Sequence, residues 1–278
     1  MSKINVNALI AAMLSLILAA CGGDGSSSSG GDTPTDGKDK PTGGDETPTV
    51  NEAQGIYRGM TDAGRELVAL VLDNGDLFFL YDSEGVSELA LGGVVLGNAD
   101  AITGDFVAND ATDINFDEDG SESASVTATY VVGQYLTGDI DGTSSGSVGF
   151  TSSYDDDYEN TPDVTAVAES YLGYYEGFSA SDNESELVII SFDDNGTFTG
   201  SSEVSSDCSF NGTITPRATG NLFDLSVSFS DTDCVYDGKT LDGIAYHDQE
   251  NYRLFIAAPT EDNSGGMFFH GYDESRLP

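Results

Sequence analysis

The chain repeatedly alternates apolar and polar residues with a period of two. The clearest runs are Phe223–Phe229 and Ser123–Tyr130. The same spacing recurs near the end of the chain, at Tyr252, Leu254, Ile256 and Ala258. A period of two is that of a strand with one face buried. With about eight such segments in each half, joined by turns rich in Gly, Asp, Asn and Ser, the pattern predicts an all-β chain of two tandem antiparallel up-and-down barrels or sandwiches.

Three motifs of the first half recur in the same order in the second half. They are a Gly-x-Tyr-x-Gly segment (Gly55–Gly59 and Gly173–Gly177), an apolar run that begins Glu-Leu-Val (Glu66–Leu72 and Glu186–Phe192), and an Asp-Asn-Gly turn (Asp73–Gly75 and Asp194–Gly196). Asn-Gly between apolar runs is the strongest short-range signal for a hairpin. Because repeats set the domain count, we predict a first β-domain at 51–158 and a second at 159–278.

One segment between the halves has helical spacing instead. Thr161 can cap a helix here, and Pro162 suits its first position. The apolar side chains that follow would fall on one face: Val164, Val167, Ala168 and Tyr171. We therefore expect one short linking helix, packed between the domains or against the end of the second.

The first 20 residues have the pattern of an export signal. Lys3 is the only basic residue before an apolar run at Ala8–Ala20, which only Ser15 interrupts. That run is shorter than the roughly 20 apolar residues of a permanent membrane span, and it suits a signal peptide with small residues at the cleavage site. Cys21 follows, and a thiol is readily acylated at a membrane surface. An ordinary signal peptide with a chance cysteine is the alternative.

Residues 21–50 have the composition of an acidic tether. Between Gly22 and Thr49 the chain contains Gly, Ser, Thr, Asp, Glu, Lys and Pro, and the first apolar residue is Val50. Such a segment cannot bury a core, so we expect it to be disordered and to hold the folded part away from a membrane.

The charge balance narrows the range of partners. The 278 residues include 9 Lys and Arg against 49 Asp and Glu, a formal net charge of -40. Phosphates of nucleic acid and anionic lipid headgroups would repel such a chain, so we expect no nucleic-acid partner. The acidic surface suits either a salty medium, which screens charge, or a cationic partner or divalent ions.

Several stretches carry a family resemblance. Leu-Ala-Ala before Cys21 resembles the lipobox of bacterial lipoproteins, and Cys208–Arg217 and Gly220–Val227 are similar to a group of uncharacterised proteobacterial lipoproteins. The resemblance implies an acylated (palmitate-bearing) Cys21 as the first mature residue, a β-barrel form, and an outer-membrane location, because Gly22 rather than aspartate follows the cysteine. It implies no activity and leaves the periplasmic or surface side open. The layout is also loosely similar to surface lipoproteins of the transferrin-binding protein B type, whose lobe motifs are absent.

The two remaining cysteines, Cys208 and Cys234, form an even pair. In an oxidising compartment such a pair predicts a disulfide. Free thiols with a redox or metal-binding role are the alternative, although no C-x-x-C motif or nearby histidine supports them.

Residues typical of catalysis are scarce. The only histidines, His247 and His270, lack an H-E-x-x-H motif and a nearby cysteine, and we expect them at the surface or a barrel rim. The spacing G-x-S-x-G occurs in the folded part at Gly142–Gly146, but a Gly- and Ser-rich turn surrounds it rather than the strand-to-helix elbow of a serine hydrolase. Among so many acidic residues, a carboxylate pair suited to glycoside cleavage carries no signal of its own. We therefore predict no catalytic residues.

One stretch resembles the first half of a calcium loop. Asn115, Asp117 and Asp119 alternate and Gly120 follows, as oxygen ligands and the bend of such a loop do. The twelfth position is Val126 rather than Glu, and the run also suits a solvated turn. We expect no cofactor, with a weak calcium candidate here, and a further acidic cluster at Asp155–Asp157.

These observations favour a non-enzymatic binding module, lipid-anchored in the outer membrane, for an unknown protein or small ligand. A periplasmic structural or assembly accessory is one alternative. A hydrolase that uses paired carboxylates is the other.

Overall fold

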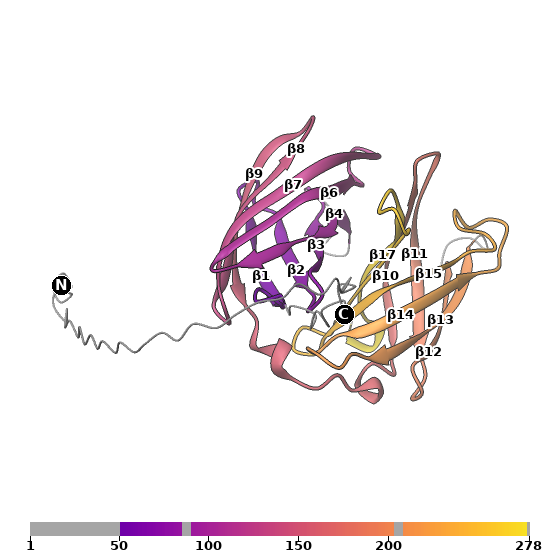
Figure 1. Ribbon diagram of the computed structural model, residues 1–278. Coiled ribbons are helices and arrows are strands. Elements are labelled where there is room, and N and C mark those ends of the chain that lie inside the picture. Colours follow the sequence, from indigo (N-terminus) through magenta and orange to yellow (C-terminus); the bar gives the residue numbers. More distant parts are fainter. Residues whose placement is uncertain (1–50, 85–89, 203–207, 277–278) are drawn as a thin grey trace, which may run out of the picture. The chain divides into compact units, whose positions relative to one another are not determined.

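The computed structural model describes residues 51–84, 90–202 and 208–276. They form two closed antiparallel β-barrels of eight strands each, the first indigo to pink and the second salmon to yellow in Figure 1. The all-β class and the tandem arrangement are confirmed, and each half is a barrel. The predicted signal peptide, Cys21 and tether lie outside the described residues. Within those residues, no helix is both long and apolar enough to cross a membrane.

The first barrel is built from hairpins in chain order. Its strands are β1 (Gly55–Thr61), β2 (Glu66–Val71), β3 (Asp76–Asp82), β4 (Leu91–Asn98), β5 (Asp100–Ile102), β6 (Asp105–Asn115), β7 (Gly120–Val131), β8 (Tyr135–Gly142) and β9 (Gly146–Tyr154). The ring closes because β9 pairs with β1 and β4 pairs with β6. The short β5 pairs only with β6 and stands outside the ring of eight.

The second barrel repeats this up-and-down order. Its strands are β10 (Ser170–Ser179), β11 (Asp182–Phe192), β12 (Thr197–Ser202), β13 (Ser209–Pro216), β14 (Phe223–Phe229), β15 (Thr240–Asp248), β16 (Arg253–Pro259) and β17 (Gly266–Asp273). Pairing of β10 with β17 closes the ring, and a 3-10 turn, η3 (Glu274–Arg276), follows.

The recurring motifs occupy equivalent places in the two barrels. The Gly-x-Tyr-x-Gly segments lie in β1 and β10, the first strand of each barrel, and the Asp-Asn-Gly turns connect β2 to β3 and β11 to β12. In these turns Gly75 and Gly196 have φ angles of 91° and 78°, in the left-handed region that glycine adopts without strain. Both hairpin predictions are confirmed.

The link between the barrels is helical over a shorter length than predicted. Two 3-10 turns, η1 (Asp156–Glu159) and η2 (Val164–Ala166), take the place of the expected helix. Asp163, rather than Thr161, caps η2 by accepting a 2.9 Å hydrogen bond from the Thr165 amide. Tyr171 explains the early end, because it belongs to β10 and packs in the second lumen.

A third apolar core lies between the barrels, in addition to the core of each lumen. Outward-facing side chains of β1–β4, such as Leu70, share one cluster with those of β15–β17, such as Phe255 and Phe268. Strands that are buried on both faces need apolar residues at consecutive positions. This explains the unbroken apolar runs Leu67–Leu72 and Leu77–Tyr81, whereas β7 and β14 alternate because one of their faces meets water.

Candidate functional site

Four connections meet at one end of the first barrel, which we call the mouth: β1–β2, β3–β4, β6–β7 and β8–β9. A cavity of about 190 Å³ opens among them. Each connection contributes to its lining, through Ala63, Glu84, Glu118 and Ser145 respectively. The cavity is smaller than the roughly 300–1,000 Å³ of sites for drug-sized ligands, so it suits a small molecule.

Asp113 and Tyr81 form the polar centre of the mouth. The Tyr81 hydroxyl donates a 2.7 Å hydrogen bond to Asp113 Oδ1. Burial raises the pKa of the Asp113 carboxyl; the Tyr81 hydrogen bond and Arg65 lower it, and Glu122 and Glu118 add to the rise. A cation beside this carboxyl would favour its ionised form.

Among the described residues that line the cavity, Arg65 is the only basic one, and it is already paired. Its Nη2 lies 3.0 Å from Glu84 Oε1, and its Nη1 lies 3.1 Å from Asp117 Oδ2. The guanidinium carbon also lies 5.2 Å from the centroid of the Tyr81 ring. Arg65 therefore holds Tyr81 in place, and acidic groups remain in excess around the cavity.

Glu122 organises the rim of the mouth. It accepts hydrogen bonds from the Thr143 hydroxyl at 3.0 Å, from the Ser145 amide at 3.1 Å and from the Ser144 amide. The Ser145 hydroxyl and these backbone donors lower the pKa of Glu122 to about 2. The hydrogen bonds of this carboxylate therefore hold the β8–β9 connection in place.

Val95, Ile140 and Val148 give the cavity an apolar wall, and Thr61 and Asn115 add two neutral polar side chains to the lining. Gly93 on β4 makes room for the polar centre, because a Cβ there would lie 2.1 Å from the Tyr81 hydroxyl oxygen. The mouth therefore places the Asp113 carboxyl and an apolar wall in the same cavity. Such a pairing can hold a molecule that carries a positive charge on a short apolar body.

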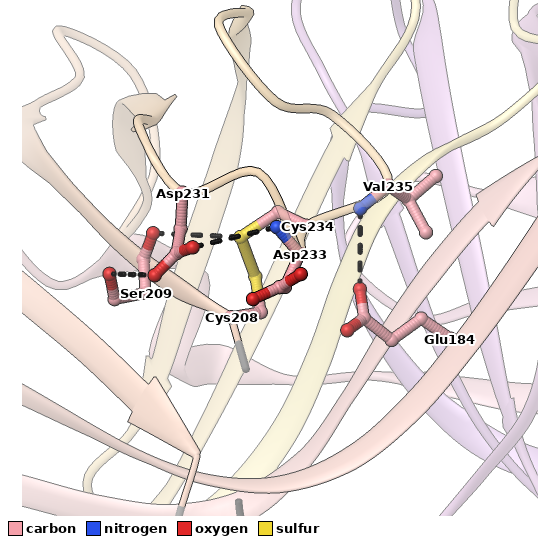
Figure 2. Close-up of a disulfide and its surroundings, with 7 residues drawn as sticks. All are labelled: Glu184, Cys208, Ser209, Asp231, Asp233, Cys234 and Val235. Atoms are coloured by element: carbon pink, nitrogen blue, oxygen red, sulfur yellow. Dashed lines mark hydrogen bonds between the residues drawn. A yellow bond between two sulfur atoms is a disulfide. The ribbon is translucent and has the colours of Figure 1, made fainter. Parts of the chain in front are cut away.

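The equivalent end of the second barrel is covered. The Cys208–Cys234 disulfide ties the start of β13 to the β14–β15 connection, as Figure 2 shows, which confirms the predicted pairing. In the same connection, the Val235 amide donates a 3.3 Å hydrogen bond to Glu184 Oε2. Cys234 and Tyr236 pack in the lumen core below. This end of the second barrel is therefore closed by the chain itself.

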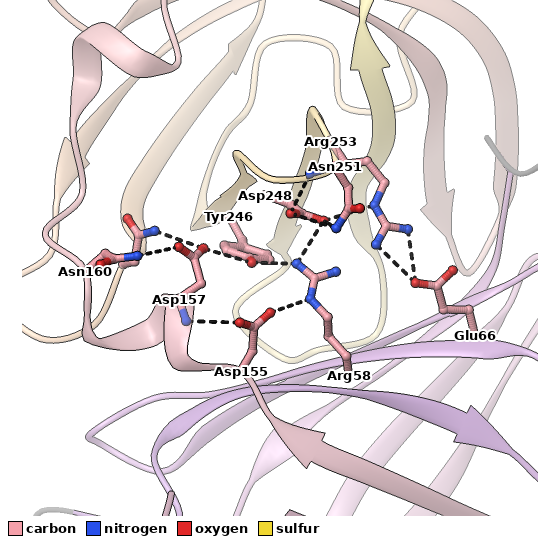
Figure 3. Close-up of polar contacts among 10 residues, drawn as sticks. Arg58, Glu66, Asp155, Asp157, Asn160, Tyr246, Asp248, Asn251 and Arg253 are labelled. Carbon is pink, nitrogen blue, oxygen red and sulfur yellow. Dashed lines mark hydrogen bonds and ion pairs between the residues drawn. The ribbon is translucent and has the colours of Figure 1, made fainter. Parts of the chain in front are cut away.

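A polar network joins the barrels beside the third core (Figure 3). Arg58 of β1 contacts Asp155 at 2.5 Å and Asp248 at 2.8 Å. Arg253 of β16 contacts Glu66 and Asp248, both at 3.1 Å. Burial is the largest single effect on Asp248 and opposes its charge, but Arg58, Asn251 and Arg253 together outweigh burial and hold the pKa of this carboxyl below its usual range. Removing one partner of such a pair would leave a buried charge uncompensated and would destabilise the contact between the barrels.

Both histidines are buried, which corrects the expectation of a surface position. His247 is 8% exposed and packs edge-on against Tyr171. His270 is fully buried in β17 and stacks on Phe255 with ring centroids 4.4 Å apart. Burial, with a smaller effect of Arg253, lowers the pKa of His270 to about 3, so the ring is neutral. Both belong to strands of the second barrel, and neither lines the mouth.

The weak calcium candidate lies in the β6–β7 connection, where its side chains have other partners. Asn115 Oδ1 accepts a 3.2 Å hydrogen bond from the Glu118 amide, and Asp117 pairs with Arg65 and accepts from the Ser83 hydroxyl. Across the described ranges, no three His, Cys, Asp or Glu side chains are grouped as metal ligands would be. Calcium binding through Asn115, Asp117 and Asp119 stays a prediction.

The sequence motifs did not indicate the mouth. The direction in which Asp113 points does not follow from simple alternation, because β6 is irregular between Ala108 and Ala111. Counting by twos from Phe106 and Ala108, which face the lumen, places Asp113 outside. The extra residue reverses the alternation and turns Asp113 inward.

Comparison with known proteins identifies no family. No family model matches the chain, and neither does any curated protein. Among solved structures, the N-lobe domain of lactoferrin binding protein B of Moraxella bovis gives a TM-score of 0.28 at 14% identity, over 66% of this chain and 80% of that one. A mutant of the vaccine antigen transferrin binding protein B from Haemophilus parasuis Hp5 gives 0.28 at 9% identity, over 81% and 78%. Likenesses at this level do not indicate what this chain binds.

Proposed function

We propose that this chain is a non-enzymatic binding module, held to the outer membrane by a lipid on Cys21, whose first barrel takes a small cationic ligand at its mouth. One observation carries the choice of site. The mouth places the partly buried carboxyl of Asp113 in a cavity, whereas the equivalent end of the second barrel is covered by a disulfide-tied connection.

Charge and size define the ligand class. In the described part of the lining, three acidic side chains (Glu84, Asp113 and Glu118) face one cation, Arg65, so an anion would meet repulsion and a cation attraction. The apolar wall of Val95, Ile140 and Val148 favours a short hydrocarbon or a single ring attached to the charge. A primary or quaternary amine with such a body satisfies both requirements.

Matched probes test the ligand class on the full-length protein. Hexylamine and phenethylamine are compared with hexanoate and phenylpropionate, which have similar apolar bodies and the opposite charge. A ligand that binds only the folded state raises the melting temperature. We expect the amines to raise it in a dose-dependent way and the acids to leave it unchanged. Equal shifts from amines and acids, or none from either, would contradict the proposed site.

Anchoring is tested separately. Mass spectrometry of the natural protein should find acylated Cys21 as the first residue, and an unmodified terminus elsewhere would contradict the anchor. Protease added to intact cells then separates the two sides of the membrane. Cleavage of the barrels indicates display at the surface, and resistance that ends when the outer membrane is permeabilised indicates the periplasmic side.

A further inference from the structure

The end of the first barrel opposite the mouth carries an unusual apolar surface. Within the described residues, six large apolar side chains are exposed, and four of them lie here. Ile102 is 67% exposed in the β5–β6 hairpin, and Val131, Val132 and Tyr135 are 37%, 63% and 39% exposed in the β7–β8 hairpin. We call these four side chains the apolar tips.

The two hairpins are neighbours, so the apolar tips form one surface. The Tyr130 amide donates a 3.0 Å hydrogen bond to the Gly104 carbonyl, which ties β7 to the turn after Ile102. Val131 and Tyr135 are direct partners across the β7–β8 ladder.

Turn chemistry alone does not account for these residues. Hairpin turns favour Gly, Asn, Asp and Ser, as in Asp73–Gly75 of the same barrel and in the Thr143–Ser145 connection at the mouth. The β7–β8 turn obtains its positive φ from Gly133, at 64°, and a polar residue could replace Val132 without backbone strain. An apolar residue at an exposed turn, beside three other exposed apolar side chains, suggests a contact that the isolated chain does not make.

The chain enters the barrel at this same end. The Asn51 amide donates to the Asp73 carbonyl at 2.9 Å, and the Asn51 side chain donates to the Ala99 carbonyl, just before β5, at 2.7 Å. Glu52 accepts a 3.0 Å hydrogen bond from the Tyr130 hydroxyl, just before Val131. Cys21 lies 30 residues earlier in the sequence (51 − 21 = 30). A lipid at Cys21 therefore brings this end of the barrel within reach of a bilayer.

We infer that the apolar tips rest on the bilayer in which Cys21 is anchored, so that the mouth points away from the membrane and the tether does not keep the first barrel clear of the bilayer. The inference rests on the proposed lipid anchor. Neither hairpin contains Lys or Arg, and Asp100 and Asp105 lie beside Ile102 in the β5–β6 hairpin. We therefore expect the apolar tips to insert among neutral headgroups rather than to bind anionic ones. Tyr135 suits the headgroup level, where its ring is apolar and its hydroxyl meets water. Four side chains alone would bind weakly, but the anchor makes the contact intramolecular and raises its effective concentration.

Tryptophan fluorescence tests this contact, because the chain has no Trp. Full-length lipidated protein carrying Val132→Trp is placed in phosphatidylcholine vesicles whose acyl chains are brominated. Ser144→Trp, at an exposed position in the mouth, is the matched control. We expect bromolipid to quench the Val132→Trp emission at least twofold more than that of the control. Equal quenching, or none at either position, would overturn the inference.

Hydrogen exchange is also measured on the protein without the Trp substitution. It checks that the introduced Trp does not itself create the contact between the apolar tips and the bilayer. Amide exchange at 131–135 should slow when the lipidated protein enters vesicles, while exchange at 143–145 should not change. Unchanged exchange at 131–135 would overturn the inference. So would an emission shift of Val132→Trp that depends on protein concentration without vesicles, because it would show a second copy on the surface.

Flotation separates this inference from the proposed anchor. The unaltered lipidated chain should float with vesicles and Cys21→Ser should not. If neither floats, the anchor itself is refuted and the contact with it. If the unaltered chain floats but Val132→Trp is not quenched, the anchor stands and only the contact of the apolar tips is refuted.

Discussion

Carboxyl groups of this chain have very different pKa values, because some are exposed and accept hydrogen bonds while others are buried. Glu122 is held ionised by the donors of the mouth, whereas Glu176 on β10 is 7% exposed and faces Asp117 and Asp119. Burial raises the pKa of Glu176 to about 7, and these like charges add to the rise although the Ser185 hydroxyl opposes it. With 49 acidic residues, the sequence could not indicate which ones are buried, because burial depends on contacts between segments far apart in the chain.

Glu176→Gln is expected to stabilise the protein above pH 7. The folded state keeps a proton on Glu176 up to about pH 7, while the unfolded chain releases it near the ordinary value of 4.5. Stability is therefore lost as the pH rises between these values, at up to about 1.4 kcal/mol per unit. Urea unfolding at pH 8 should show the variant to be about 2–3 kcal/mol more stable than the unaltered protein, by the same relation.

At pH 4 the two proteins should have nearly equal stability, because Glu176 is then protonated in both states. Glu250→Gln, at an exposed position, is the control and should change stability at neither pH. A Glu176→Gln protein that is no more stable at pH 8 would contradict the buried carboxyl.

At the scale of elements, hairpins and their turns could be predicted from the sequence. Period-two alternation marked β7 and β14, and Asp-Asn-Gly marked the same turn in both barrels, because these signals depend on neighbouring residues. The linking helix was predicted too long, since the pairing of Tyr171 in β10 overrides its helical spacing. The disulfide could be expected because only Cys208 and Cys234 remain once Cys21 is assigned to lipid.

Removing the disulfide with Cys208→Ser and Cys234→Ser together should destabilise the second barrel. The bond spans a sequence separation of 26 residues. Closing a loop of this size is worth about 3.5 kcal/mol in the chain-entropy estimate, because it restricts the unfolded state. Urea unfolding of the unaltered and doubly substituted proteins measures the difference. Unchanged midpoints would mean that the bond adds nothing to stability, and reducing agent should shift only the unaltered protein.

At the scale of the whole molecule, the repeated sequence motifs predicted two β-domains but not the third core between them. The apolar runs in β2 and β3 were consistent with buried strands, yet only the partner surface on β15–β17 shows what covers their outer faces. The ion pairs of Arg58 and Arg253 also join residues that are distant in sequence. The third core and this network together imply that the barrels unfold as one unit.

Leu70→Lys tests this coupling, because Leu70 is 1% exposed in the third core. A lysine there places an uncompensated charge between the barrels, at a cost of about 3–5 kcal/mol. Calorimetry should show one cooperative transition for the unaltered protein and two separate transitions for the variant. Thr127→Lys, on an exposed position of β7, should keep the single transition. Two transitions in the unaltered protein would contradict the coupling.

The central claim is that Asp113 holds a cationic ligand at the mouth. Calorimetric titration with phenethylamine tests it most directly, by comparing the full-length unaltered protein with its Asp113→Asn variant. Asp139→Asn makes the same change at an exposed position of β8. Losing the charge partner of a buried cation should weaken binding by about 2 kcal/mol or more, a factor of roughly thirty. We predict that loss for Asp113→Asn and unchanged affinity for Asp139→Asn. Equal affinities for both variants and the unaltered protein would contradict a cation site at the mouth.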